Sequence, residues 1–380
     1  MALDIPRYLQ LAEIIEEKSA FLFGPRSTGK SHLINKQFPN GHIINLLKAT
    51  DRRRFVENPT LLHDFIKRID KKEPIIIDEI QMVPELLNEV HSIIEETGHR
   101  FLLTGSSARK LKRTNANMLG GRAKRCEFFP LTWKELSTVN QFNLEKYLLY
   151  GGIPRIYLSQ NPTDELSDYV DTYLDQEIKA EAVSRNIIGF ERFLQKISLA
   201  SGETLVYANI ASDVQLTPPT VRQYIEVLED TLLSFSLIPW QGPIRKAIQS
   251  SRFFLFDIGL RWFLSQVASL PEASNLFGQA FEQFIVQEVR ACISYRRLKN
   301  HLYFWRTTHN DEVDLIIGDD SAIEVKAAKK VSSRDASGLL KLKDEGFQGR
   351  LIVVSRDEIC RSKGDIEFLF WEEFLNQIWK

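Results

Sequence analysis

The sequence predicts an α/β protein whose first part contains a parallel, doubly wound sheet. Two observations predict it: short apolar runs recur along the first 130 residues, and stretches with helical spacing separate them. Strands that alternate with helices are typical of parallel sheets. The expected strands are residues 20–23, 42–46, 74–77 and 101–104, followed by 126–129, which Pro130 would end.

A chain of 380 residues is long enough for two or three domains. Helical spacing is expected at residues 6–18, and most of the chain between residues 131 and 195 should be helical, with a break at Gly151-Gly152. Helices and strands alternate again from about Gly278, with a hairpin-like pair around Gly318. The predicted segments are 1–130, 131–195, 196–245 and 246–380.

The composition excludes several classes of protein. A net charge of −1 excludes a global attraction to nucleic acid, so any polyanion must bind at local clusters of basic residues. Three scattered cysteines exclude a disulfide scaffold and a CxxC zinc site, and they fit a reducing compartment. We find no signal peptide and no apolar run long enough to span a membrane, and we therefore expect a cytoplasmic protein without membrane contact.

Residues 24–31 fit the phosphate-binding pattern G-x-x-x-x-G-K-[ST] at every position. They follow an apolar strand and precede a helix-like stretch, which is the context that this motif requires. Backbone N–H groups of the loop and the positive end of the helix would surround the phosphates, Lys30 would reach the β and γ phosphates, and the Ser31 hydroxyl would bind Mg²⁺. The expected contacts are Gly24, Pro25, Arg26, Ser27, Thr28, Gly29, Lys30 and Ser31.

A second element supports ATP and Mg²⁺ as cofactors. The apolar run 74–77 ends in Asp78, which would hold Mg²⁺, and Glu79, which would polarise the attacking water. The alternative is a glycine turn and an unrelated strand that happens to end in acids. Either Thr104 or Ser106, after the next strand, could sense the γ-phosphate, or these hydroxyls could cap a helix.

The chain resembles a prokaryotic family of AAA+ ATPases in which a C-terminal domain of unknown function follows the ATPase module. The motifs that carry the resemblance are IPRYL, GPRSTGKS, IIIDEIQ, LLTGSSARKL, LGGRAKRCEFFPL and YGGIPRIY, then FFLFDIGLR, GQAFEQFIVQEV and DEVDLIIGDDSAIEVK. The resemblance implies a helical lid at 131–195 and a homo-oligomer such as a hexameric ring. It also implies that Arg122 or Arg125 reaches a neighbour's γ-phosphate and that Arg155 acts as a lid sensor; solvated or DNA-facing arginines are the alternative.

Residues 204–240 have the pattern of a winged helix. Two short helices separated by a turn at 215–217 would precede a wing strand beginning near Leu232. If this segment binds DNA, Thr220, Arg222 and Gln223 would face the groove. The alternative is a structural winged helix, because several acidic residues accompany the single basic residue of the second helix.

Two strands near the C-terminus resemble the PD-(D/E)xK nuclease core. Asp314 and Glu324 would hold a divalent metal with Lys326 beside them, and Glu282 matches the additional acidic residue of such cores. A four-residue loop between the strands would turn Asp314 away from Glu324, whereas a three-residue loop would place both on one face. The alternative is a nuclease-like fold that does not cut, or an exposed charged hairpin.

Basic residues are clustered, which favours local binding of phosphates or DNA, although such clusters are also typical of solvated faces. We therefore hold two hypotheses: an ATP-driven DNA-processing protein acting on branched or broken DNA, and a nucleotide-controlled switch whose state a partner protein detects. The clusters are Arg109, Lys110, Lys112, Arg113, Arg122, Lys124 and Arg125; Arg245, Lys246 and Arg252; Arg290, Arg296, Arg297 and Lys299; and Lys326, Lys329, Lys330 and Arg334.

Overall fold

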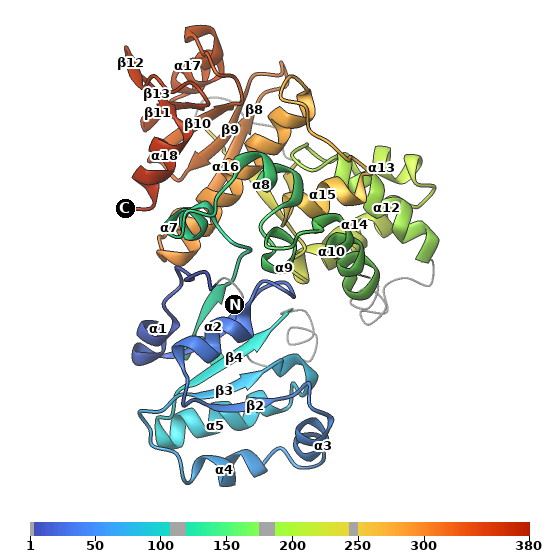
Figure 1. Cartoon of the computed structure of the whole chain (residues 1–380), viewed down its shortest axis with the longest axis vertical. Coiled ribbons are helices and arrows are strands. Elements are labelled where there is room, and N and C mark those ends of the chain that lie inside the picture. Colours follow the sequence, from blue (N-terminus) through green and yellow to red (C-terminus); the bar gives the residue numbers. More distant parts are fainter. Residues whose placement is uncertain (1–3, 107–118, 175–186, 243–249) are drawn as a thin grey trace. The chain divides into compact units, whose positions relative to one another are not determined.

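The computed structural model describes residues 4–106, 119–174, 187–242 and 250–380. The chain forms two compact units (Figure 1). Unit 1 comprises Met1–Leu131 with Asp230–Leu232, and unit 2 comprises Thr132–Glu229 with Leu233–Lys380. Within the described residues no helix combines the length and the apolar character needed to cross a membrane.

Unit 1 contains a five-stranded parallel sheet with the order β2-β3-β4-β1-β5. Because all strands are parallel, their carboxyl ends meet at one edge of the sheet. The central strands are fully buried, as expected for a sheet covered on both faces. The strands are β1 (Ser19–Phe23), β2 (His42–Asn45), β3 (Ile75–Asp78), β4 (Phe101–Gly105) and β5 (Ala123–Glu127).

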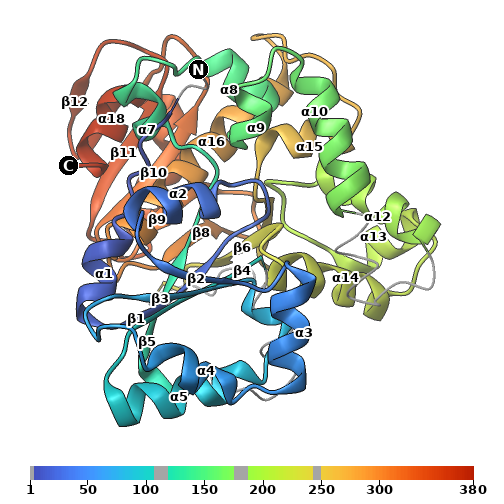
Figure 2. The same cartoon turned by 60° about the horizontal axis from the view of Figure 1, so that its bottom comes forward.

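Helices cover both faces of this sheet. Figures 1 and 2 show α1 and α2 on one face and α4 and α5 on the other. Alternate strand residues, such as Phe21, Ile77 and Leu103, pack into the core on the α4 and α5 side. The helices of unit 1 are α1 (Leu11–Glu17), α2 (Lys30–Gln37), α3 (Ala49–Glu57), α4 (Leu61–Ile66) and α5 (Leu86–Thr97), with 3-10 turns η1 (Ile80–Met82) and η2 (Leu119–Gly121).

Unit 2 begins with a helical part whose apolar core includes Phe193, Val221 and Leu260. The turn after α8 (Leu144–Tyr150) requires glycine, because Gly151 has a φ of 73° and a Cβ there would lie 2.1 Å from the Asp257 carboxylate. The helices are α7 (Trp133–Thr138), α8 (Leu144–Tyr150), α9 (Pro154–Tyr157), α10 (Pro162–Tyr169), the π-helical η3 (Val170–Leu174), α12 (Ile187–Leu199), α13 (Tyr207–Asp213), α14 (Pro218–Asp230) and α15 (Ile258–Leu264).

Unit 2 also contains a mixed sheet of eight strands with the order β12-β13-β11-β10-β9-β8-β6-β7. The strands are β6 (Ser234–Pro239), β7 (Arg252–Leu255), β8 (Leu302–Arg306), β9 (Glu312–Ile317), β10 (Ser321–Lys326), β11 (Arg350–Ser355), β12 (Arg361–Lys363) and β13 (Ile366–Phe370). The accompanying helices are α16 (Asn275–Tyr295), η4 (Ser333–Ala336), α17 (Ser337–Asp344) and α18 (Trp371–Ile378).

Most expected elements are present, with three differences. The predicted helix 6–18 begins only at Leu11, because the Arg7 side chain anchors the preceding segment to backbone carbonyls. The last strand of the first sheet lies at Ala123–Glu127, three residues earlier than expected. Apart from Asp230–Leu232, the three segments expected after residue 130 lie in unit 2, and the boundaries between them stay predictions. The expected wing strand β6 pairs with β8 as well as β7.

A buried carboxyl group joins the start of unit 2 to its long helix α16. Glu288 is 1% exposed, and its carboxylate accepts a hydrogen bond of 2.7 Å from the Trp133 backbone N–H. Burial raises the pKa of Glu288 to about 8. The folded protein therefore binds the Glu288 proton more tightly than the unfolded chain does, and stability associated with that proton is lost as the pH rises toward 8.

We expect Glu288→Gln to gain stability relative to the wild type as the pH rises, because glutamine cannot ionise. The difference in unfolding free energy should grow by about 1.4 kcal/mol per pH unit between the unfolded and folded pKa values, and level off above the latter. Denaturant titrations from about pH 5 to pH 9 measure it. The exposed Glu145→Gln serves as the control; a pH-independent difference for Glu288→Gln would contradict the assignment.

Candidate active site

The phosphate loop connects β1 to α2 at the carboxyl edge of the unit 1 sheet. The loop needs unusual backbone geometry, since Ser27 has a φ of 59° and Gly29 a φ of 95°. Gly24 lies against β5, where a Cβ would come within 2.5 Å of the Phe128 carbonyl. Its N–H donates to the Gly105 carbonyl over 3.3 Å, which ties the loop to the end of β4.

Lys30 is the first residue of α2 and is 7% exposed. Its Nζ donates to the carbonyls of Gly24 and Pro25 over 2.6 and 3.0 Å. Thr28 is also buried, and its hydroxyl donates to the Pro25 carbonyl over 2.8 Å. The loop is thus curled around its own lysine, which places an ammonium group at the N-terminus of α2, where anions bind.

Arg7 anchors the phosphate loop from the outside, a role that sequence reasoning did not assign. Its guanidinium donates to the Thr28 carbonyl over 2.6 Å and to the Phe129 carbonyl over 2.7 Å. It also lies 4.0 Å from the centre of the Phe128 ring. The arginine therefore joins the phosphate loop to the segment that follows β5. The signal in the sequence that could have identified Arg7 is the motif IPRYL, which contains it.

The acidic pair lies where β3 ends. Asp78 is 7% exposed and accepts a hydrogen bond from the Thr104 hydroxyl, while that hydroxyl accepts one of 3.1 Å from the Glu79 N–H. Glu79 has a φ of 61°, a left-handed conformation that non-glycine residues seldom adopt. The strain is placed at the residue expected to act on water, which is where functional sites often hold it.

Gln81 holds the Glu79 carboxylate in place. Its side-chain amide donates to the carboxylate of Glu79 and, over 3.2 Å, to the Ser106 hydroxyl. Gln81 is 6% exposed, and a Cβ on Gly105 would come within 2.6 Å of its oxygen. Both hydroxyls considered as sensors, Thr104 and Ser106, therefore contact the acidic segment; the role of Gln81 itself was missed.

These residues fit a nucleoside triphosphate with Mg²⁺. In the sheet order β3-β4-β1, the strand bearing Thr104 separates the acidic pair from the loop, and all three ends share one edge. Ser31 is exposed in the first turn of α2. Lys30 could neutralise phosphate charge, while Ser31 and Asp78 supply the oxygens that Mg²⁺ prefers in nucleotide sites.

The three arginines predicted to contact nucleotide have other partners within the chain. Arg122 pairs with Glu95 of α5, and Arg125 lies 5.7 Å from the Phe23 ring centre. Arg155 belongs to unit 2, is 65% exposed and pairs with Glu165 and Asp168 of α10. Their assignment as finger and sensor residues stays a prediction.

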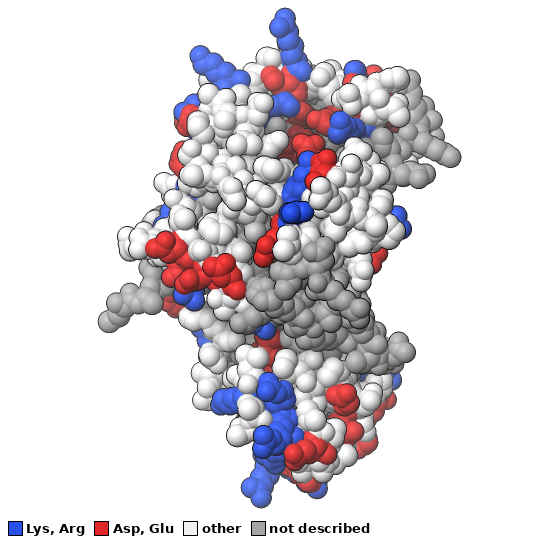
Figure 3. All heavy atoms as spheres, turned by 90° about the vertical axis from the view of Figure 1, so that its right-hand side faces the viewer, with Lys and Arg blue, Asp and Glu red and all other residues white. Residues whose placement is uncertain are grey.

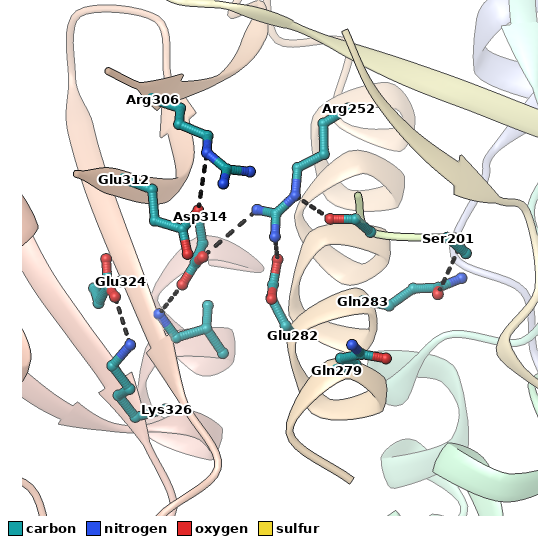
Figure 4. A network of polar contacts seen from close by, with 12 residues as sticks. Ser201, Arg252, Gln279, Glu282, Gln283, Arg306, Glu312, Asp314, Glu324 and Lys326 are labelled. Atoms are coloured by element: carbon teal, nitrogen blue, oxygen red, sulfur yellow. Dashed lines mark hydrogen bonds and ion pairs between the residues drawn. The ribbon is translucent and has the colours of Figure 1, made fainter. Parts of the chain in front are cut away.

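The acidic residues of the predicted nuclease centre do meet in unit 2. Ser321 pairs with Ile317, so residues 318–320 form the three-residue loop that was required. Figure 4 shows Asp314 and Glu324 on neighbouring strands, with Glu282 of α16 opposite them. Lys326 Nζ lies 2.5 Å from Glu324, and Asp314 also accepts from the Val325 N–H over 2.8 Å.

Arg252 of β7 stands among these carboxylates. Its guanidinium lies 2.7 Å from Glu282 and 3.5 Å from Asp314 (Figure 4). Burial raises the pKa of Glu282 and of Glu324, and nearby Asp314 raises both further. Burial by itself lowers the pKa of Arg252, but Glu282 and Asp314 outweigh it and raise that pKa. Among the described residues, no group of three or more His, Cys, Asp or Glu side chains is arranged to hold a metal ion.

The predicted basic clusters are only partly visible. Those at 107–118 and 243–249, including Arg109, Lys110 and Arg245, lie outside the described residues. An additional cluster, Arg52–Arg54 of α3, was not predicted; Arg53 and Arg54 line a surface hollow of about 430 Å³. Figure 3 shows Lys and Arg gathered over the lower part of the picture, where unit 1 faces the viewer.

Comparison with known families supports a nucleotide-binding site in unit 1. Residues 16–137 match the model of an AAA domain. Residues 141–270 and 277–374 match two models, each described as a domain of unknown function, DUF8612 and DUF4143. The chain therefore carries an AAA P-loop ATPase domain, which implies nucleotide binding, followed by these two domains.

Two relatives are described as uncharacterized proteins. One, from Mycobacterium tuberculosis, is 24% identical over 307 residues, which are 78% of this chain and 66% of the relative. The other, from Methanocaldococcus jannaschii, is 26% identical over 344 residues, which are 80% of this chain and 73% of the relative. The match thus spans about two thirds of the mycobacterial relative.

Among solved structures, the Orc1 protein of Aeropyrum pernix in complex with DNA has a TM-score of 0.27 and 15% identity, over 67% of this chain and 90% of that chain. A STAND-class signal-transduction ATPase of Pyrococcus horikoshii also has a TM-score of 0.27, with 16% identity over 79% of this chain and 48% of that chain. Likenesses at this level indicate neither an activity nor a partner.

We expect Gln81→Leu to slow ATP turnover about tenfold while ATP affinity stays within about twofold, because one hydrogen bond to the Glu79 carboxylate is worth about 1.4 kcal/mol. Steady-state turnover and equilibrium binding of a fluorescent ATP analogue measure the two effects. Gln348→Leu, in an exposed turn of unit 2, is the matched control. A parallel loss of affinity and melting temperature would indicate a structural role instead.

Proposed function

We propose that this chain is a Mg²⁺-dependent ATPase that works as a nucleotide-controlled switch. The observation that carries the ATPase assignment is the shared edge of the unit 1 sheet, where the curled loop around Lys30 and the acidic pair Asp78 and Glu79 flank the end of β4. An ammonium group, a helix N-terminus and two carboxylates at one edge suit phosphoryl transfer to water.

The residues divide the chemistry among them. Lys30 and the loop N–H groups bind and orient the phosphates, and Ser31 and Asp78 would hold Mg²⁺, which neutralises charge on the phosphoryl oxygens. Glu79 would accept the proton of the attacking water. Thr104 keeps Asp78 oriented through its hydroxyl, and Gln81 does the same for Glu79.

The switch rests on how the loop is tied to the rest of unit 1. Lys30 binds loop carbonyls that phosphates would compete with, and Arg7 links the same loop to Phe129 and Pro130. A change of the loop on nucleotide binding would therefore act on the chain segment that leads out of unit 1. This connection supports the switch, because the segment that Arg7 holds continues directly along the chain into unit 2.

DNA processing is the competing role, and the contacts in unit 2 favour it less. Helices α13 and α14 precede strand β6, which pairs antiparallel with β7 and parallel with β8, and the winged-helix assignment of this segment stays a prediction. However, Arg222 lies 5.5 Å from the Tyr207 ring centre and Thr220 bonds to Thr217, so two of the three candidate DNA contacts have partners inside the chain. The described part of the chain thus presents one engaged arginine on α14, beside acidic residues.

The oligomeric ring and the finger residues also remain part of this proposal. Arg122 pairs with an exposed glutamate, so it could exchange that partner for a neighbour's phosphate at small cost, because exposed ion pairs contribute little. Arg125 is exposed on β5. Either arginine could complete an active site shared between two copies.

We expect Lys30→Ala to weaken ATP binding by at least about tenfold, because a charge-assisted contact to phosphate is lost. Glu79→Gln should bind ATP normally and hydrolyse it about 100-fold more slowly, because the proton acceptor is lost. Equilibrium binding and phosphate release measure the two effects. Lys36→Ala, on the same helix but paired with Asp4, is the control; normal turnover in Glu79→Gln would exclude its role.

We expect ATP turnover to change less than about twofold when single-stranded, double-stranded or branched DNA is added, because Arg222 is the one basic residue of α14 and Glu226 and Glu229 on the same helix would repel phosphates. Phosphate release is measured across this panel at low and high salt. Strong stimulation that falls steeply as salt rises would overturn the switch and support the DNA-processing role.

A further inference from the structure

The acidic centre of unit 2 contains the residues for a divalent metal, yet the protein supplies its own cations there. Glu282 comes from α16, Asp314 from β9 and Glu324 from β10 (Figure 4). Each is at least partly buried, with Asp314 5% and Glu324 6% exposed. Buried carboxylates need a cation or hydrogen-bond donors close by, since isolated charges are costly inside a protein.

Arg252 provides that cation from a position that bridges two of the three elements. One guanidinium nitrogen lies 2.7 Å from Glu282 and another lies 3.5 Å from Asp314, whereas the Lys326 ammonium lies 2.5 Å from Glu324. A metal ion shared by Glu282 and Asp314 would have to occupy the space between them, which the guanidinium fills. The arrangement therefore does not fit a divalent ion.

Further contacts hold the Arg252 guanidinium in its position between the carboxylates. Arg252 is 9% exposed, donates from Nε to the Gly202 carbonyl, and lies 5.7 Å from the Phe254 ring centre. These contacts come from the helical part of unit 2 and from the neighbouring residues of β7. The arginine cannot leave the carboxylates by a side-chain rotation into solvent without losing these contacts.

The formal charges agree with this interpretation. Three carboxyl groups face two cations in the folded centre. Among the described residues, one buried carboxyl oxygen of Glu282 and one of Glu324 make no hydrogen bond, and that of Glu282 lies 2.7 Å from the Arg252 guanidinium. Without Arg252, the three carboxyl groups would face Lys326 alone, which leaves an excess of two negative charges when all three are ionised. That excess equals the charge of one divalent ion, so arginine and metal are alternatives.

We propose that Arg252 is an internal counter-cation that closes a latent divalent-metal site formed by Glu282, Asp314 and Glu324. In the closed state this centre performs no metal-dependent chemistry and instead joins β7 to α16 and β9. Displacement or loss of Arg252 opens the site to an ion that prefers carboxylate oxygens, such as Mg²⁺ or Mn²⁺.

The test uses the full chain and Mn²⁺ alone, without nucleotide, in calorimetric titrations. Wild type and Asp314→Asn should bind Mn²⁺ equally, because the centre is closed in both. Arg252→Met should bind one more Mn²⁺ ion per chain than the wild type does, and Arg252→Met with Asp314→Asn should lose that additional site. Arg306→Met, whose arginine pairs with Glu312 beside the same hairpin, is the control and should gain nothing.

Two results would overturn the proposal. One is Mn²⁺ binding by the wild type that Asp314→Asn removes, because the site would then be open already. The other is a folded Arg252→Met variant without the additional site. If that variant does not fold, Arg252→Lys retains one charge but cannot bridge both carboxylates; it should show a weaker additional site that depends on Asp314, and its failure to do so counts equally against the proposal.

Discussion

A charged side chain that leaves water must find polar partners inside the protein, and both polar centres of this chain are built on that requirement. In unit 1, Lys30 and Arg7 are buried against backbone carbonyls, and their contacts shape the phosphate loop. In unit 2, Arg252 is buried against carboxylates and connects strands to a helix. The same physical demand produces a site open to an anion in one unit and a site closed to a cation in the other.

The difference follows from the partners. Backbone carbonyls carry only partial charge, so a phosphate can compete with them for the Lys30 ammonium. Carboxylates carry a full charge and are held from rigid elements, so a guanidinium between them is hard to displace. In the proposed function, a nucleotide would therefore change the geometry of the loop in unit 1, whereas the buried ion pairs of unit 2 suit a structural task.

Much of unit 1 could be predicted from the sequence because its signals are local. The phosphate loop is a continuous motif whose glycines permit the required backbone, and the acidic pair ends a continuous apolar strand. The supporting residues were missed for the opposite reason. Arg7 and Gln81 act through partners that are distant in sequence or lie across a turn, and no spacing rule identifies which carbonyl or carboxylate they reach.

The sequence by itself determined which segments of unit 1 form strands, the loop around Lys30, the acidic pair and the presence of three acidic residues in the C-terminal part of the chain. Each of these depends on residues that are adjacent in the chain or recur at a fixed period. Only the tertiary structure decided the three-residue loop that turns Asp314 toward Glu324, and the position of Arg252 between Asp314 and Glu282. Those outcomes depend on register and on packing between elements far apart in sequence, where a one-residue shift or one side chain changes the chemistry.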